Sequence, residues 1–384
     1  MPRFWRMTVK VLGIAVVLLG AAAVWKRDEI ARLLAVNSLF APENIVANFS
    51  HMDQLFFNLP LSRGPGPVAP LPEGPAATLP PQSAPWIADR AITALVVLKD
   101  GAMVHESYYL GTNPDDLRIS WSVAKSFLSA LFGILQAEGA FGDLSDPVIK
   151  YAPSLKGSAY ETATIHDVLT MASGVAFNED YLDFNSDINK MGRVLALGGS
   201  MDGFAAGLTA SAASPGKRWH YVSIDTHVIC MVIRGATGRD IPELMNEKLL
   251  APMGLEADPV MLTDGSGVSF VLGGLNLRTR DYARFGQMVL QGGMWQGKQV
   301  VPAAWIEAST APQAADGSAY GYQWWIPADA APGEVMAQGI YGQYIYIHPG
   351  LGVVIAVNAA DRGFEDAGVA EANLAMFRAI ANGL

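Results

Sequence analysis

The chain contains a helical segment, residues 124–138, that carries apolar side chains on nearly every side. The next residue, Gly139, occupies the position where a helix C-cap is expected. A helix that is apolar all round is typical of the interior of a large domain. The chain can build such an interior, because 51% of its 384 residues are hydrophobic and only 16% are charged. We therefore expect a compact fold that encloses residues 124–138.

Ser122 and Lys125 stand at the start of this helix and are three residues apart. Residues with that spacing share one helix face, so the lysine amine can reach the serine hydroxyl. A serine at its ordinary pKa is a poor nucleophile and needs a group that accepts its proton. Alternatively, Ser122 only caps the helix and Lys125 extends to solvent. A second S-x-x-K match at Ser214 and Lys217 contains Pro-Gly, which favours a turn.

Tyr221 is a third candidate for the same chemistry. It follows a Pro-Gly turn, and a hydroxyl residue, Ser223, comes two positions later. Tyrosine is protonated at neutral pH, so it acts as a base only beside a cation, which Lys125 would supply. The two groups would then titrate as a pair. Taken alone, Tyr221 is better explained as a packed residue with a bonded hydroxyl. His220 is close enough in sequence to perturb such a site.

Attack on a carbonyl creates a negative charge on oxygen, which preorganised N–H groups stabilise. The Ser122 amide, at a helix N-terminus, is one candidate donor. The second is the backbone amide of Ile340, in a glycine-containing segment that permits close approach of a strand.

Strand patterns occur near both ends of the chain, and helical patterns occupy the middle. The predicted strands cover residues 91–98, 103–110, 320–326, 335–348 and 353–357, and residues 364–382 are a predicted terminal helix. Lys99-Asp100-Gly101 is a hairpin signal between the first two strands. We expect one antiparallel sheet built from both chain ends, with a mainly helical lobe inserted at about 112–315.

The serine, lysine, tyrosine and strand motifs occur in the order and approximate spacing of one known family. From about residue 41 to its C-terminus, the chain resembles the serine β-lactamase-like hydrolases of the class C type. Within them it is similar to 6-aminohexanoate-dimer hydrolase and related carboxylesterases. The resemblance also includes residues 169–174, 281–286 and 339–343. It implies an α/β (α+β) fold of the β-lactamase/transpeptidase type.

The resemblance also implies roles for the residues named above. Ser122 would be the acylated nucleophile, Lys125 and Tyr221 its proton-transfer partners, and the amides of Ser122 and Ile340 the oxyanion hole. Tyr181, in the loop 178–181, would contact the substrate.

We expect Ser223, Gly339 and Tyr341 to contact the substrate as well. Glu179 and Asp180, beside Tyr181, are most simply explained as solvated charges.

Two departures from the family pattern narrow the expected substrate. Ser223 replaces the asparagine of the Y-x-N motif, and Ala337 replaces the lysine of the K-T-G motif, which would hold a β-lactam carboxylate. An uncharged ester or amide therefore fits better than a β-lactam. The alternative is a β-lactamase or D,D-peptidase-like protein, or a catalytically silent binder of cell-wall peptide. A Ser-His-Asp α/β-hydrolase is disfavoured because no G-x-S-x-G motif occurs.

The N-terminus has the pattern of a targeting segment. Basic residues precede and follow an apolar run, and Ala21-Ala22-Ala23 resembles a signal-peptide cleavage site. We expect residues 1–26 to be a signal peptide or a membrane anchor crossing at about 7–25, and the protein to be exported, either periplasmic or anchored facing the periplasm. Residues 27–86 would be an N-terminal segment with a Pro-rich tether, and 87–384 the hydrolase domain.

Composition bears on partners too. The net charge of −10 argues against nucleic acid, and the single cysteine, Cys230, excludes an intramolecular disulfide. No metal-binding motif occurs, so we expect no metal and no cofactor, and a small ester or amide as the partner. The oligomeric state stays open.

Overall fold

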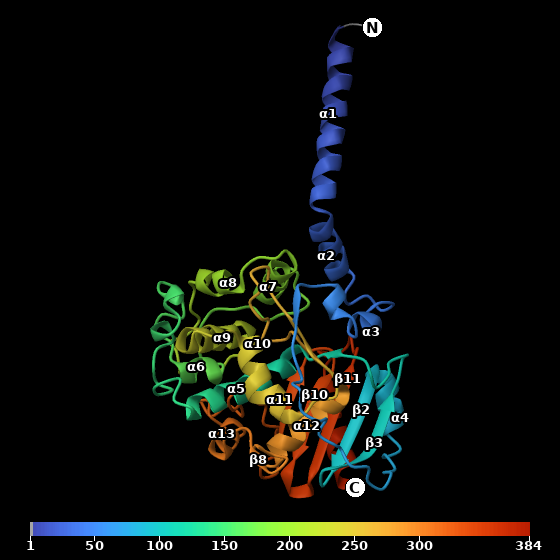
Figure 1. The fold of residues 1–384 in the computed structure, drawn as a ribbon, viewed down its shortest axis with the longest axis vertical. Coiled ribbons are helices and arrows are strands. Elements are labelled where there is room, and N and C mark those ends of the chain that lie inside the picture. The colour runs from blue at the N-terminus through green and yellow to red at the C-terminus, as the bar shows by residue number, and fades with distance from the viewer. Residues whose placement is uncertain (1–2) are drawn as a thin grey trace.

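A computed structural model describes residues 3–384 (Figure 1). The side chains of residues 3–7, 9, 15, 19, 22, 23 and 28 lie outside the described part, and they include Arg3, Arg6, Ala22 and Ala23 of the predicted targeting segment. The described chain forms a body of sheet and helices from which the first helix projects.

A five-stranded antiparallel sheet joins the two ends of the chain, in the order β3-β2-β11-β10-β9. Its strands are β2 (Ile92–Lys99), β3 (Ala102–Tyr108), β9 (Val335–Gly339), β10 (Gln343–His348) and β11 (Val353–Ala359). β2 pairs with β11, with Val97 opposite Ile355. The hairpin turn between β2 and β3 contains Asp100 and Gly101, both with positive φ. The predicted sheet from both chain ends is confirmed.

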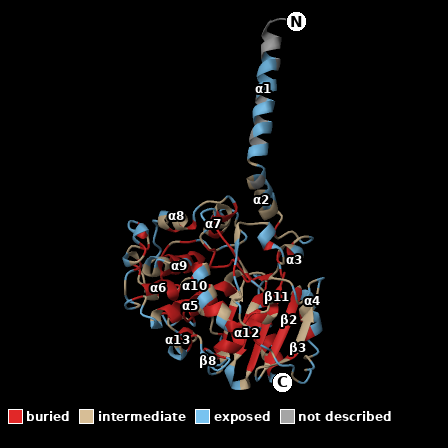
Figure 2. Ribbon diagram, viewed as in Figure 1, coloured by how far each residue is buried: buried red, intermediate tan, exposed pale blue. Residues whose placement is uncertain are grey.

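Helices cover both faces of this sheet. Val96 and Leu98 pack in the core cluster that also contains Phe285 of α12 (Thr279–Leu290). Leu95 and Val97, which point to the opposite face, pack with residues of α4 (Ser83–Asp89) and α14 (Val369–Asn382). Because both faces are covered, every residue of β2 except Lys99 at its end is buried, and β2 and β11 are red in Figure 2.

The inserted lobe is built around α5 (Ala124–Ala137), in which every residue from 124 to 135 is buried. Gly139 has a φ of +80° directly after the helix, as a C-cap glycine does. At Gly133 the ring of Trp305 lies so close that a Cβ atom would be 2.1 Å from it. The predicted buried helix is therefore confirmed, and α9 (Ser223–Thr237) and α13 (Ala303–Ser309) pack against it.

The remaining elements of the lobe are short. Its other helices are α6 (Ile165–Leu169), α7 (Asp187–Ala196), α8 (Met201–Gly207), α10 (Ile241–Met245) and α11 (Ala251–Met253). A small sheet runs in the order β1-β5-β6-β4, from β1 (Asn58–Pro60), β5 (Val260–Leu262), β6 (Leu275–Leu277) and β4 (Arg118–Ile119). β7 (Met294–Trp295) and β8 (Lys298–Gln299) form a hairpin. The mainly helical lobe thus carries short strands that the sequence patterns did not predict.

Two predicted strands differ from the structure. Residues 320–326 are not a strand: Tyr320 and Trp325 form only an isolated bridge, and Gln323 between them has a φ of +65°, which breaks an extended conformation. The predicted strand 335–348 is split into β9 and β10, because Tyr341 and Gly342 both have positive φ and reverse the chain.

The N-terminal segment begins with α1 (Arg3–Trp25), which extends away from the body, and α2 (Arg27–Asn37), which lies on it (Figure 1). Described apolar side chains of α1 are exposed, among them Val16 and Trp25. Among the described residues, no helix combines the length and hydropathy that a membrane crossing needs. The membrane crossing expected at residues 7–25, the signal peptide and export stay predictions.

The Pro-rich stretch that follows runs along the body. β1 pairs with β5, the Ala69 amide donates to the carbonyl of Gly254, and the Gly74 amide donates to that of Met103.

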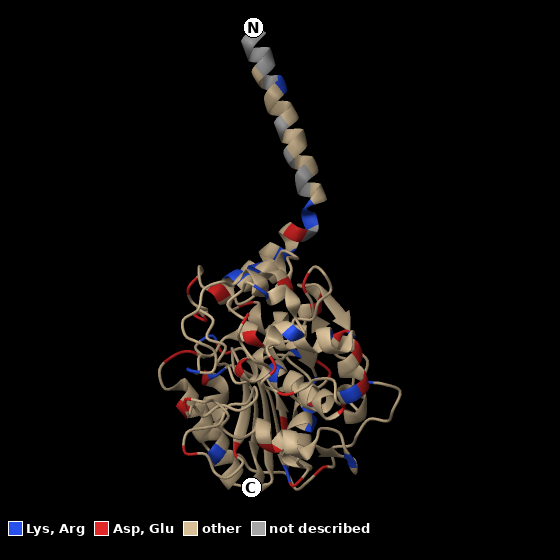
Figure 3. Ribbon diagram, turned by 90° about the vertical axis from the view of Figure 1, so that its left-hand side faces the viewer, with Lys and Arg blue, Asp and Glu red and all other residues tan. Residues whose placement is uncertain are grey.

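In the view of Figure 3, acidic and basic residues are interspersed over the body.

Candidate active site

Ser122 lies in a 3-10 turn, Trp121–Val123, that leads directly into α5. Trp121 has a φ of +40°, a conformation that is costly for a bulky residue and that surrounding structure must stabilise. Its ring supplies that stabilisation by packing 5.7 Å from Phe49 and 5.9 Å from Phe40. The turn holds Ser122 at the wall of a cavity of about 280 Å³.

Lys125 is buried, with 1% of its surface exposed, and points back toward Ser122. Its Nζ lies 3.0 Å from Ser122 Oγ, 3.2 Å from Ser223 Oγ and 3.1 Å from the carbonyl oxygen of Leu272. Burial lowers the pKa of Lys125 to about 7, although the carboxylates of Glu179 and Asp225 act in the opposite direction. The amine is therefore substantially neutral at pH 7 and has a lone pair for the serine proton. The alternative that Lys125 extends to solvent is wrong.

Tyr221 lies just before α9 and faces the same amine. Lys125 Nζ is 5.2 Å from the centroid of its ring, and the ring stacks on Trp325 at 5.2 Å. Burial and the neighbouring Glu179 raise the pKa of Tyr221 above its ordinary value, and the hydroxyls of Ser122 and Ser223 partly offset that rise. Of the two candidate bases, Lys125 is the one whose neutral form burial favours, whereas burial favours the protonated form of Tyr221.

Glu179 belongs to this group of side chains, which the sequence patterns did not indicate. The Ser223 amide donates to Glu179 Oε2 at 3.0 Å, and the Ser223 hydroxyl donates to Oε1 in a short hydrogen bond. The Tyr181 hydroxyl donates to the same Oε1 at 2.7 Å. Glu179 is thus no freely solvated charge. Two features of the sequence could have pointed to Glu179 as a site residue: it lies two residues before Tyr181, and position 223 lacks the asparagine of the family motif.

A second carboxylate lies deeper. Asp225 is fully buried, and burial raises its pKa to about 8. Its Oδ1 accepts hydrogen bonds from the Tyr160 hydroxyl at 2.7 Å and the Ser173 hydroxyl at 2.8 Å. Ser173 belongs to the segment 169–174 that the resemblance includes. The pair of hydroxyl donors fixes the start of α9, and with it Tyr221 and Ser223, against the core.

The end of β9 lies directly against the turn that contains Ser122. A Cβ atom at Gly339 would be 2.8 Å from the Ser120 carbonyl oxygen and 2.9 Å from the Ser122 nitrogen, so only glycine permits this approach. Ile340 lines the same cavity as Ser122. The structure thus brings together the two segments predicted to supply the oxyanion-hole amides. Ala337 is buried, with 1% exposed, and carries no cation.

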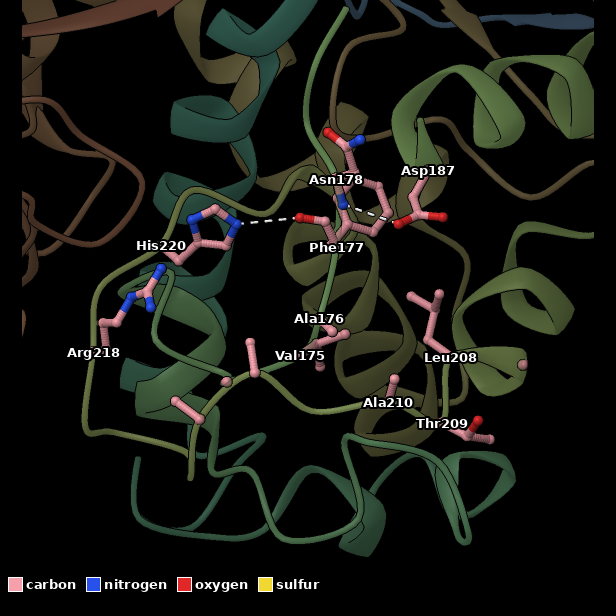
Figure 4. Close-up of a pocket in the computed structure, with 14 residues that line it drawn as sticks. Val175, Ala176, Phe177, Asn178, Asp187, Leu208, Thr209, Ala210, Arg218 and His220 are labelled. Atoms are coloured by element: carbon pink, nitrogen blue, oxygen red, sulfur yellow. Dashed lines mark hydrogen bonds between the residues drawn. The ribbon is translucent and has the colours of Figure 1, made fainter. Parts of the chain in front are cut away.

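The cavity beside Ser122 also contains the predicted substrate contacts Tyr181, Ser223 and Tyr341. His220 does not face it. Its Nε2 lies 3.2 Å from the Phe177 carbonyl oxygen, in a larger hollow of about 520 Å³ that is also lined by Arg218 (Figure 4). In the described part of the chain, no group of His, Cys, Asp or Glu side chains has the arrangement of a metal site.

Comparisons with known proteins identify the family. The Beta-lactamase family model matches residues 87–377. The chain is 30% identical over 273 residues to 6-aminohexanoate-dimer hydrolase of Paenarthrobacter ureafaciens, covering 67% of this chain and 69% of the relative.

Solved structures agree in fold. A candidate 6-aminohexanoate-dimer hydrolase from Bacillus anthracis superposes with a TM-score of 0.79 at 24% identity, covering 90% of this chain and 95% of that one. A family VIII carboxylesterase superposes with a TM-score of 0.60 at 14% identity, covering 81% and 99%. The chain therefore belongs to the β-lactamase family, as one of its serine hydrolases.

Proposed function

We propose that the protein hydrolyses an uncharged ester or linear amide through an acyl-enzyme on Ser122. The observation that carries the proposal is the buried amine of Lys125, 3.0 Å from the serine oxygen and with a pKa lowered to about 7. A base is most effective when its pKa lies near the working pH, because it is then both available and able to hold the proton.

The proposed acylation follows from this arrangement. Neutral Lys125 takes the proton of Ser122 as Oγ attacks the substrate carbonyl. The resulting oxyanion accepts hydrogen bonds from the amides of Ser122 and Ile340, and each such donor is worth about 3–4 kcal/mol. Tyr221, which keeps its proton, donates it to the departing oxygen or nitrogen and is reprotonated from Lys125. The carbonyl–leaving-group bond breaks and the acyl-serine remains.

Deacylation reverses the proton path. Water attacks the acyl-serine and gives its proton to the neutral amine of Lys125. The Ser122 oxygen leaves and is reprotonated through Tyr221, so that the acid product departs and the starting protonation is restored. No cofactor takes part in this scheme.

The substrate class rests on two observations. Ala337 stands where a lysine would bind a β-lactam or peptide carboxylate, and it is buried and apolar. The relative that shares 30% identity is named for a linear amide, the 6-aminohexanoate dimer. Ester and linear amide hydrolysis are therefore favoured over β-lactamase or D,D-peptidase activity and over silent binding of a cell-wall peptide.

The test is hydrolysis of p-nitrophenyl butyrate by the full chain beside Ser122→Ala, with mass spectrometry of the protein during turnover. We expect a mass increase of one butyryl group on the unmodified protein, and neither turnover nor adduct in Ser122→Ala. The matched control is Ser214→Ala, which removes the exposed serine of the other S-x-x-K match and should behave as the unmodified protein. Equal rates in Ser122→Ala and the unmodified protein would contradict the proposal.

A further inference from the structure

The end of α2 and the residues after it form one wall of the cavity at Ser122. Val36, Asn37, Leu39 and Phe40 all line it. Leu39 is buried, with 2% exposed, and the ring of Phe40 stacks on Tyr341 at 4.6 Å with an interplanar angle of 15°. Residues 36–40 therefore pack against the cavity at Ser122, although they precede Ser122 by more than eighty residues in the chain.

The segment is also fastened outside the cavity. Arg32 Nε donates a hydrogen bond to the Ala196 carbonyl at 3.3 Å, at the end of α7. Its guanidinium lies 4.1 Å from the centroid of the Phe57 ring. These contacts join α2 to the lobe that carries the opposite wall.

The opposite wall is formed by α7 and is mainly apolar. Ile188, Met191 and Leu195, which are 8%, 1% and 3% exposed, line it together with Asn189, Gly192 and Arg193. Phe270 and Leu272 extend this surface toward Lys125, whose amine lies 3.1 Å from the Leu272 carbonyl oxygen.

Charge is almost absent from the lining. Among the described residues that line the cavity, Arg193 is the only one with a charged side chain. Its guanidinium lies 4.2 Å from the ring centroid of Phe184 and donates to the Phe184 carbonyl at 2.8 Å. No carboxylate lines the cavity in the described chain, and the oxygens of Glu179 already accept hydrogen bonds from Tyr181 and Ser223. A substrate ammonium beside α7 would therefore enter without a free counter-charge.

We propose that residues 36–40 and α7 form an acyl pocket that selects an uncharged aliphatic acyl chain and rejects one ending in an ammonium group. The inference rests on the proposed Ser122 chemistry and narrows its substrate class. Each methylene buried in such a pocket favours binding by roughly fourfold. An unpaired ammonium loses its hydration, which opposes entry of an aminoacyl chain of equal length.

The test uses the full chain and p-nitrophenyl esters of acetate, butyrate, hexanoate and 6-aminohexanoate. We expect kcat/KM to be at least about tenfold higher for hexanoate than for acetate. We also expect it to be at least about tenfold higher for hexanoate than for 6-aminohexanoate, because these two acyl chains differ chiefly in the terminal charge. A flat profile, or a preference for the 6-aminohexanoyl ester, would overturn the inference.

Two variants on α2 locate the effect. Val36→Glu places a carboxylate in the wall, so the preference for hexanoate over 6-aminohexanoate should fall by about tenfold or more. Leu34→Glu is the matched control: this leucine is 63% exposed on the same helix and does not line the cavity, so the substrate profile should not change. Equal effects of the two variants on the substrate preference would contradict the proposal that residues 36–40 select the acyl chain.

The outcomes separate the inference from the function on which it rests. If Ser122→Ala hydrolyses these esters as fast as the unmodified protein, the acyl-enzyme proposal fails. If hydrolysis depends on Ser122 but does not vary with acyl length or charge, the acyl pocket alone is refuted. The substrate series on the unmodified chain tests the acyl pocket even if Val36→Glu does not fold.

Discussion

Glu179→Gln should shift the pH dependence of hydrolysis to lower pH. The substitution removes a negative charge and keeps the shape of the side chain. Glu179 is one of the two carboxylates that raise the pKa of Lys125 against the effect of burial. Ser223 Oγ, 3.2 Å from Lys125 Nζ, bridges the two groups. Without the carboxylate, the ammonium form of Lys125 loses a stabilising partner.

The size of the shift follows from Coulomb's law. Two charges roughly 5 Å apart, at an effective dielectric constant of about 25–40, interact by about 1.7–2.7 kcal/mol, which corresponds to roughly 1–2 pKa units. Lys125 is active in its neutral form, so activity rises as the pH passes its pKa. The midpoint of the acid limb should therefore move from about 7 down by roughly one to two pH units.

The assay is kcat/KM for p-nitrophenyl butyrate from acid to alkaline pH at constant ionic strength, because charge interactions depend on salt. Asp180→Asn is the control: this exposed neighbour accepts hydrogen bonds from the amides of Leu182 and Asp183 rather than from the site, and its profile should match that of the unmodified protein. An unchanged midpoint in Glu179→Gln, or one that moves to higher pH, would refute the assignment of Lys125 as the base that Glu179 tunes.

Three further predictions follow from single contacts. Tyr221→Phe should lower kcat by about 10²–10⁴-fold and leave thermal unfolding nearly unchanged, because it removes only the proton donor; near-normal kcat in single-turnover measurements would exclude that role. Gly339→Ala should reduce kcat by about 10²-fold or more, since the added Cβ would lie 2.9 Å from the Ser122 nitrogen. The control Gly66→Ala, whose Cβ would have no atom within 4 Å, should leave kcat unchanged. Arg284→Met should lower the unfolding free energy by about 3–5 kcal/mol in urea titrations, because it leaves two carboxylates without the cation that contacts each at 2.8 Å; a loss below about 1 kcal/mol would show that these ion pairs are not needed.

Local pattern was sufficient for several parts of the structure. The helix after Ser122 could be predicted because its apolar residues, its C-cap glycine and its length are all encoded within one short segment. The hairpin between β2 and β3 could be predicted for the same reason. The S-x-x-K spacing placed Lys125 on the helix face that reaches Ser122, and the structure shows that contact.

Other features depend on residues that are distant in the chain. Glu179 meets Ser223 across 44 positions, and its neighbours in sequence look like those of any solvated loop. Residues 320–326 have a strand-like composition, yet Gln323 breaks the strand, and its side-chain amide donates to the carbonyls of Val168 and Leu169 instead. Tertiary hydrogen bonds here override the local β preference.

The buried helix, the order of the motifs that contain Ser122, Lys125 and Tyr221, and the family to which they point could all be predicted from the sequence. The burial of Lys125, the carboxylates that act on it and the position of residues 36–40 at the cavity became known only from the folded chain. The difference arises because Ser122, Lys125 and the helix that follows are linked by short-range backbone geometry. A pKa and a cavity are instead set by the whole surroundings of a group, which come from segments that only folding brings together.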